Sequence, residues 1–469
     1  MWIKGVSPSA VYIDCSIPDG RTVCKGVSSL ALAEPHRVHE RVYANAATIG
    51  ILTSAAKLVG AAKVVIMARF FGTADQLDAF LIAFLLPSFL SDVVAGSLTP
   101  CLIPQLVKSQ TPRRMAAWAL TAALGVMSIA ALGLAIAGRW LLPLAASSFS
   151  AQKLRLAEAL LLGLLLWLPM SACIAICRAV LNANGRFALA AIATMGSPLM
   201  TIALLYVLPK QWGVAVLCAG TVGGVGLEWL VLAVSVRRLG YPILPAWPDW
   251  TSTWMKQLGR QYIPLAASAI ILSACTVVDQ SVAGRLGSGQ VSALAYGTKL
   301  AAVLLAIAGS SLGTAVLPAF SRMAATEDWA KIRKTVWSYC GTIAAFSLPA
   351  TFALIAGSGI LIRAVFEHGA FGESATQLVT QVQRYALLET PFAMVLAVVT
   401  RLTAALSANA LLLPMGIAAL TTNVIFDLLF SRWFGVAGIA LATAVVRAVS
   451  LAVLILLLRR HVRRWCPAE

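Results

Sequence analysis

Long apolar stretches constrain this sequence more than any other feature. About twelve segments of roughly 20 residues, bounded by Pro, Gly or basic residues, fill residues 44–458. Each is long enough to cross a bilayer core of ~30 Å at ~1.5 Å per helical residue. Backbone polar groups inside lipid must find partners within the chain, and a helix supplies them all. The sequence therefore predicts an all-α, polytopic membrane protein.

Composition and charge agree with this class. Hydrophobic residues make up 60% of the chain and charged residues 12%, with a mean hydropathy of +0.86. The net charge of +18 would suggest a nucleic-acid partner in a soluble protein. Here most Lys and Arg residues gather in alternate loops and in both tails, as the positive-inside rule describes. We therefore expect both termini in the cytoplasm and no nucleic-acid partner.

The spans divide into two sets of six. We expect them at 44–71, 78–106, 115–137, 157–181, 188–208, 213–236, 263–283, 291–319, 337–357, 385–406, 414–430 and 435–458. The predicted organisation is a polar cytoplasmic tail (1–43), a first six-helix bundle (44–236), a cytoplasmic connector (237–262), a second six-helix bundle (263–458) and a basic cytoplasmic tail (459–469). An even number of spans per half makes the two bundles a parallel pseudo-repeat, a plan on which transporters are built.

Charges within the spans are the candidate functional residues, because they are costly in lipid. Lys57 and Lys63 lie in the first span, Asp92 in the second, Asp279 in the seventh and Lys299 in the eighth. These spans are repeat equivalents, which predicts a polar cavity shared between the halves. The alternative is that the lysines reach an interface or pair with acids that hold helices together. Further charges in the spans are Arg178, Glu228, Arg401, Asp427 and Arg447; for Lys57, Arg178 and Arg447 we favour the alternative.

Several short motifs occur in a fixed order along the chain. They are Ala56–Lys63 with Ala68–Gly72, Asp78–Phe80 with Leu86-Pro87, Asn182–Phe187, Tyr296–Leu300, Val316–Pro318 with Ser321-Arg322, and Val365–Phe371. Together they resemble the MviN family, the lipid II flippases of the multidrug/oligosaccharidyl-lipid/polysaccharide exporter superfamily. The resemblance covers nearly all of 44–458.

The resemblance implies a flippase that works by alternating access in the bacterial cytoplasmic (inner) membrane. Its substrate would be a glycan linked to a polyprenyl pyrophosphate, bound by Lys57, Lys63, Arg69 and Lys299. Asp92 and Asp279 would moderate these lysines or bind a coupling ion of unknown identity. Translocation needs no covalent chemistry, and the sequence has no GxxxxGK[ST] phosphate loop, so we expect neither an enzyme nor a cofactor.

The sequence also departs from the family pattern. Lysines stand at 57, 63 and 299 where the family has arginines, and Lys lacks the planar fork that binds phosphate through two bonds. Ser91-Asp92 and Ala95–Ser97 replace a basic pair and a Glu. The lipid II flippases also have two helices after the twelfth, whereas this sequence ends at Glu469. We therefore expect an exopolysaccharide or surface-glycan precursor as substrate, with membrane lipids, a polysaccharide polymerase and glycosyltransferases as partners.

Three other functions compete with this reading. A lipid II flippase for peptidoglycan synthesis is the first alternative. A cation-coupled multidrug antiporter would need a cavity centred on acids, whereas lysines predominate here. A membrane glycan polymerase would need long external loops with basic and His residues, whereas only Arg363, Glu367, His368 and Arg384 lie in a moderately long one here.

Overall fold

The computed structural model describes residues 35–242, 246–247, 253–306, 320, 323, 329–406 and 408–465. The chain divides into two compact units, Met1–Ala47 and Thr48–Glu469. In the first unit the described residues, 35–47, are helical and form the start of α1 (Pro35–Phe71). Regular structure in the described residues is helical throughout, without a strand, which confirms the all-α class.

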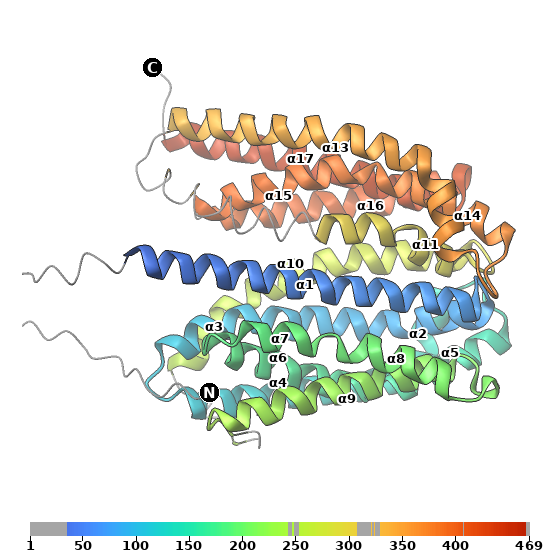
Figure 1. Ribbon diagram of the computed structural model, residues 1–469, viewed down its shortest axis with the longest axis horizontal. Helices are drawn as coiled ribbons and strands as arrows, with labels where there is room; N and C mark the ends of the chain where they lie inside the picture. Colours follow the sequence, from blue (N-terminus) through green and yellow to red (C-terminus); the bar gives the residue numbers. More distant parts are fainter. Residues whose placement is uncertain are drawn as a thin grey trace, which may run out of the picture. The chain divides into compact units, whose positions relative to one another are not determined.

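The first half of the protein contains α1 to α9 (Figure 1). After α1 come α2 (Asp75–Ser91), a π-helical turn η1 (Asp92–Gly96) and α3 (Ser97–Lys108), which together form the second span. The remaining elements are α4 (Pro112–Ala145), α5 (Ala151–Leu164), α6 (Trp167–Ala183), α7 (Phe187–Ala193), α8 (Gly196–Val207), η2 (Lys210–Trp212) and α9 (Ala215–Arg238).

The second half begins with α10 (Thr253–Arg285) and α11 (Gln290–Gly297), and residues 299–306 are again helical. The elements after these are α13 (Trp329–Phe366), α14 (Glu373–Leu387), α15 (Glu389–Ala405), η3 (Asn409–Leu411), α16 (Leu412–Phe434) and α17 (Val436–Trp465). Residues 253–262, which the sequence assigns to the connector, therefore belong to the helix α10.

Eleven helical segments of the described residues are long and apolar enough to cross a membrane. They coincide in order with eleven of the predicted spans. The eighth predicted span, 291–319, appears as the shorter apolar segment Gln290–Ala306. Its remainder, 307–319, lies outside the described residues, as does most of the motif at 316–322.

The helix contacts of the first half recur in the second. α2 packs on α5 as α11 packs on α14, α4 on α6 as α13 on α15, and α8 on α9 as α16 on α17. The fourth and tenth spans are also both interrupted, after Leu164 and after Leu387. The predicted parallel repeat is therefore confirmed by the order and packing of the helices.

The second span is irregular for a reason visible in its sequence. Pro87, Pro100 and Pro104 each lack a backbone N–H and disturb the turn before them. Between Pro87 and Pro100 the helix widens into η1, with Gly96 at its end. A π-helical turn of this kind is a frequent feature of functional sites in helices.

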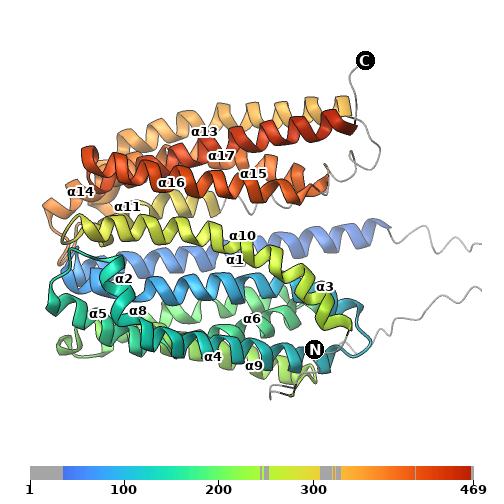
Figure 2. The ribbon, with the colours of Figure 1, turned by 180° about the vertical axis from the view of Figure 1, so that it is seen from behind.

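Within the described residues, α10 and α11 of the second half pack against the first half. α10 contacts α2, η1, α3 and α4, and α11 contacts α2. One buried apolar cluster joins the halves, with Leu77 and Ile82 from the first and Tyr296 and Val382 from the second. α2, α5, α11 and α14 gather at one end of the helices, at the left in Figure 2. We call it the closed end; it is where residues 69–78, 284–296 and 366–371 meet.

Candidate substrate site and the charges around it

Three of the predicted lysines form one electrostatic group. Lys57 and Lys63 lie on α1, and Lys299 begins the helical residues 299–306. The charges of Lys63 and Lys299 repel each other, and so do those of Lys299 and Lys57. Lys63 and Lys299 are partly buried, and Lys57 is exposed. The five ion pairs found among the described residues include none of the three. Both halves thus contribute to this positive lysine group, which has no ion-pair partner within the described part of the chain.

Arg69, the fourth predicted substrate residue, belongs to the closed end. Its side chain is exposed, two residues before the end of α1. It borders a groove of about 610 Å³ together with Gln76, Tyr206 and Gly369. Its backbone carbonyl accepts a hydrogen bond from the Ala370 N–H, with 2.9 Å between N and O. The structure therefore ties Arg69 to the contact between the halves, and no described interaction joins it to the lysine group.

The two predicted acids lie in different surroundings. Asp92 is exposed at the first position of η1 and takes part in none of the described ion pairs. Asp279, on α10, accepts a hydrogen bond from the side-chain amide of Asn423, with 2.8 Å between Nδ2 and Oδ1. Neither acid forms an ion pair with Lys63 or Lys299, so helix pairing of the lysines with these acids is absent from the described residues.

Asp279 instead faces a second carboxyl group. The side chain of Asp427, on α16 and fully buried, is close enough to Asp279 for their negative charges to repel each other. Within the described part of the chain, neither Asp427 oxygen has a hydrogen-bond donor from another residue. Arg447 exerts an electrostatic attraction on Asp279 from α17. Two neighbouring carboxyls, here one fully buried and one partly buried, repel each other unless a proton or a cation lies between them.

Asp427 is among the intramembrane charges visible in the sequence, but its proximity to Asp279 is not. The one signal in the sequence is the spacing of Asp427 from Asn423, because residues four apart share one face of a helix. Their partner Asp279 lies 144 residues from Asn423 along the chain, a separation that a single sequence cannot bridge.

Two further ion pairs occupy equivalent places in the halves. Arg178 on α6 pairs with Glu228 on α9. Arg447 on α17 pairs with Glu389 on α15, with 3.2 Å between Nε and Oε2. The fourth and sixth spans are thus joined as the tenth and twelfth are, with acid and base exchanged. The expectation that Arg178 and Arg447 serve in helix pairing agrees with these contacts.

The closed end contains a buried acid whose role the sequence analysis missed. Asp78, fully buried at the start of α2, accepts hydrogen bonds from the backbone N–H groups of Gly289 (2.7 Å) and Ser292 (2.9 Å). Lys153, from α5, lies 3.1 Å from Asp78 and 2.5 Å from Asp75. Asp78 therefore caps the first turn of α11 from the other half, where unpaired N–H groups favour an anion.

Close backbone contacts complete the closed end. Gly72 and Gly369 both have positive φ angles, and a Cβ on either would collide with the carbonyl oxygen of the facing segment. The Tyr296 hydroxyl donates to the Gly72 carbonyl oxygen at 3.0 Å. These contacts explain why the motif at 365–371 contains glycine at position 369.

Two halves whose described helices repeat in order and packing, which meet along α10 and at the closed end and both carry basic residues, have the architecture of a membrane transporter. A family model described as lipid II flippase MurJ matches residues 67–465. The chain therefore belongs to this family, a family of transporters, and the predicted relationship is confirmed.

Individual relatives agree with the family assignment. A protein of Synechocystis sp. named "Probable lipid II flippase MurJ" is 25% identical over 440 residues, which cover 89% of this chain and 81% of the relative. One of the same name from Vibrio cholerae is 22% identical, covering 89% and 83%. A solved structure of lipid II flippase MurJ in an inward closed conformation has a TM-score of 0.77 at 21% identity, covering 88% of this chain and 87% of that one. A Vibrio cholerae MATE transporter reaches 0.64 at 14% identity, covering 91% and 98%, so the likeness in fold extends to that group.

Proposed function

We propose that this protein carries lipid II, a polyprenyl-pyrophosphate-linked glycan, across the inner membrane. The observation that carries the proposal is the family match over residues 67–465, together with relatives named lipid II flippases. It favours the reading that the sequence analysis placed second, ahead of an exopolysaccharide precursor. In both readings the ligand that the lysine group meets is the same, a pyrophosphate on a polyprenyl tail.

The lysine group supports an anionic headgroup. Lys63 comes from the first half and Lys299 from the second, so a pyrophosphate between them would bring the two halves together electrostatically. A lysine ammonium acts as a point charge with three rotatable donors, and it tolerates a headgroup that turns during transport. Each charge-assisted contact contributes about 1.5–3 kcal/mol where water is excluded. Lys57, exposed beyond them, would form the entrance to this site.

The closed end supports alternating access. Asp78 and its backbone partners join the halves at the closed end, and in this proposal the headgroup enters from the other end. Release then requires the contacts of Asp78 with Gly289 and Ser292 to separate as the halves rock. We assign the closed end to the outer side of the membrane and both termini to the cytoplasm, because the loops at the other end carry most of the basic residues.

Asp279 and Asp427 support coupling to a cation. The pair holds two acids on α10 and α16 with Asn423 beside them, and a small cation between the carboxyls would remove their repulsion. Because the cation bridges two helices of the second half, its binding would change how they pack. In this proposal Asp279 keeps the ion-coupling role predicted from the sequence and acts together with Asp427. No described interaction connects Asp92 with this pair.

The substrate can be tested in cells whose own lipid II flippase can be switched off. The full chain is expressed as the resident protein is depleted, and an enzyme that cleaves lipid II is added outside the cells. We expect cleavage products and continued growth. Lipid II that stays protected, while the protein is present in the membrane at normal level, would instead favour the exopolysaccharide precursor. A Lys63→Glu, Lys299→Glu variant is the inactive control.

A further inference from the structure

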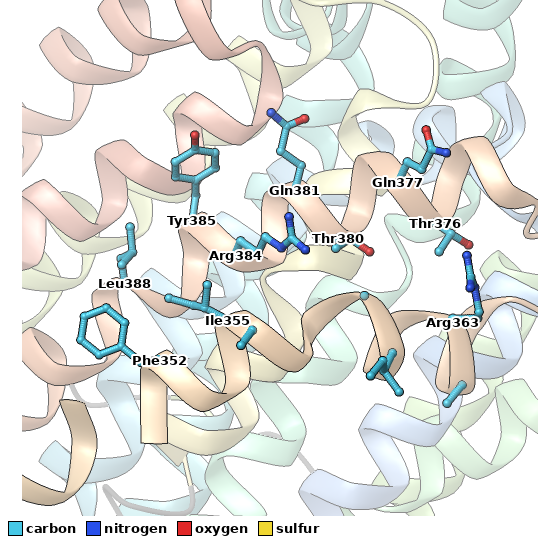
Figure 3. Close-up of a pocket in the computed structure, with 14 residues that line it drawn as sticks. Phe352, Ile355, Arg363, Thr376, Gln377, Thr380, Gln381, Arg384, Tyr385 and Leu388 are labelled. Carbon is cyan, nitrogen blue, oxygen red and sulfur yellow. The ribbon is translucent and has the colours of Figure 1, made fainter. Parts of the chain in front are cut away.

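A groove of about 1230 Å³ lies between α13 and α14, at the closed end of the second half and apart from the lysine group. Figure 3 shows Arg363, from α13, and Arg384, from α14, on its facing sides. One wall includes Phe352 and Ile360, whose side chains are 65% and 78% exposed. Exposure of large apolar side chains on a membrane-spanning helix means contact with lipid. The groove therefore opens sideways into the bilayer.

The polar residues of the groove follow one face of α14. Gln377, Gln381 and Arg384 are exposed at spacings of four and three residues, which places them on one side of the helix. The hydroxyl oxygen of Thr380, beside them, is buried and has no hydrogen-bond partner among the described residues. Such a stripe of donors along a helix that should face lipid is costly unless a polar ligand covers it.

The depth of Arg384 indicates where the ligand's charge would lie. The span Glu373–Ala405 has 33 residues, about 50 Å of helix, against a hydrocarbon core of ~30 Å. With the span centred on the bilayer, Arg384 lies about 7 Å inside the hydrocarbon boundary, and its long side chain reaches the headgroup level. Phe352 and Leu388, which line the deeper part, then lie at the level of acyl chains.

The charge of the groove is positive. Arg384 takes part in none of the described ion pairs. Arg363, near the end of α13, donates its Nε–H to the Glu367 carboxylate, with 3.2 Å between Nε and Oε2. The same Glu367 oxygen accepts a hydrogen bond from the Thr376 hydroxyl at 3.0 Å. The terminal nitrogens of Arg363 remain for a ligand. The arrangement is thus basic at the rim and at the hydrocarbon boundary, and apolar below.

We propose that this groove binds an anionic phospholipid of the membrane leaflet at the closed end. The phosphate lies against Arg384 and Arg363, the amides of Gln377 and Gln381 contact the headgroup, and an acyl chain follows Phe352 and Leu388. A phospholipid fits better than the transported lipid because the groove opens to the bilayer rather than to the interface between the halves. The site is independent of the lipid II proposal.

The test is native mass spectrometry of the full chain in neutral detergent, titrated with phosphatidylglycerol or phosphatidylcholine. We expect one phosphatidylglycerol to bind about tenfold more tightly than phosphatidylcholine. Arg384→Gln should lower the affinity for phosphatidylglycerol about fivefold to tenfold, and Arg384→Lys should keep most of it. Arg432→Gln is the matched control, because Arg432 is an exposed arginine of the same half outside the groove.

A groove-filling variant and a second lipid probe distinguish a phospholipid from other occupants of the groove. Ala356→Trp fills the groove and leaves both arginines in place, so it should also abolish the preference, which keeps the test valid if Arg384→Gln fails to fold. Equal binding of the two phospholipids, or an undiminished preference in both variants, would overturn the proposal. A polyprenyl phosphate that binds in the groove while phosphatidylglycerol shows no preference would also overturn it, and would assign the groove to the carrier lipid.

Discussion

The carboxylate of Asp78 accepts a hydrogen bond from the backbone N–H of Gly289 at 2.7 Å, although 211 residues separate the two. Asp78 belongs to the first half and Gly289 to the turn before α11 in the second. The Asp78 side chain is fully buried, and Lys153 and Ser292 also contact its carboxylate. Separating a buried carboxylate from two amides and an ammonium costs a large free energy. These contacts therefore hold the two halves together at the closed end.

Replacing Asp78 by Asn should weaken the closed end. The variant leaves Lys153 buried with a poorer partner and removes one acceptor from the α11 amides, so we expect a loss of about 3–5 kcal/mol of stability. Melting temperature of the purified protein measures it. Asp75→Asn is the control, because Asp75 is 60% exposed and its pair with Lys153 should contribute at most about 1 kcal/mol. Equal losses for the two variants would contradict a special role for Asp78.

Gly369→Ala should destabilise the protein by more than its backbone angle explains. Gly369 has a φ of +68°, and an added Cβ would press on the backbone carbonyl of Arg69. Gly185, just after α6, has a comparable φ of +71° but open space around its Cβ position. Gly185→Ala should therefore cost only the left-handed strain of about 1–2 kcal/mol, with Gly369→Ala clearly above it. Thermal unfolding of both variants gives the comparison, and similar melting temperatures would refute the close approach.

The acid pair predicts a cation effect on stability. Because the charges of Asp279 and Asp427 repel each other, binding of a monovalent cation between them should raise the melting temperature as its concentration increases. Asp427→Asn removes the repulsion, so the variant should melt higher than the unaltered protein without added cation and respond little to it. Choline chloride at equal ionic strength is the control for screening. If Asp427→Asn keeps the full cation response, the pair is not the binding site.

The sequence was sufficient for the spans but not for their connections. Apolar stretches such as 435–458 are read directly because length and hydropathy alone decide whether a helix can cross lipid. The intramembrane charges are visible for the same reason. Their partners are not, since Asp279 meets Asn423 across 144 residues and Asp78 meets Ser292 across 214. Asp78 also sits at the edge of its predicted span, where an acid normally indicates nothing more than a solvated helix start.

Lys63 and Lys299 provide the most direct test of the transport site. Because a phosphate needs positive charge rather than a particular fork of donors, Lys→Arg at either position should keep substantial transport. Lys→Ala should reduce it, on the order of 10²-fold in affinity for a desolvated contact, and Lys→Glu should abolish it. External cleavage of lipid II in the depletion strain measures transport, and protein level in the membrane controls for folding.

A double variant separates this role from helix pairing. If Lys299 served only to neutralise Asp279, removing both side chains should restore transport. The structure pairs Asp279 with Asn423 and Asp427 instead. We therefore expect the Lys299→Ala, Asp279→Ala variant to be no more active than Lys299→Ala alone. Normal transport by the double variant, at normal protein level, would show that Lys299 acts through Asp279. It would contradict phosphate binding by the lysine group.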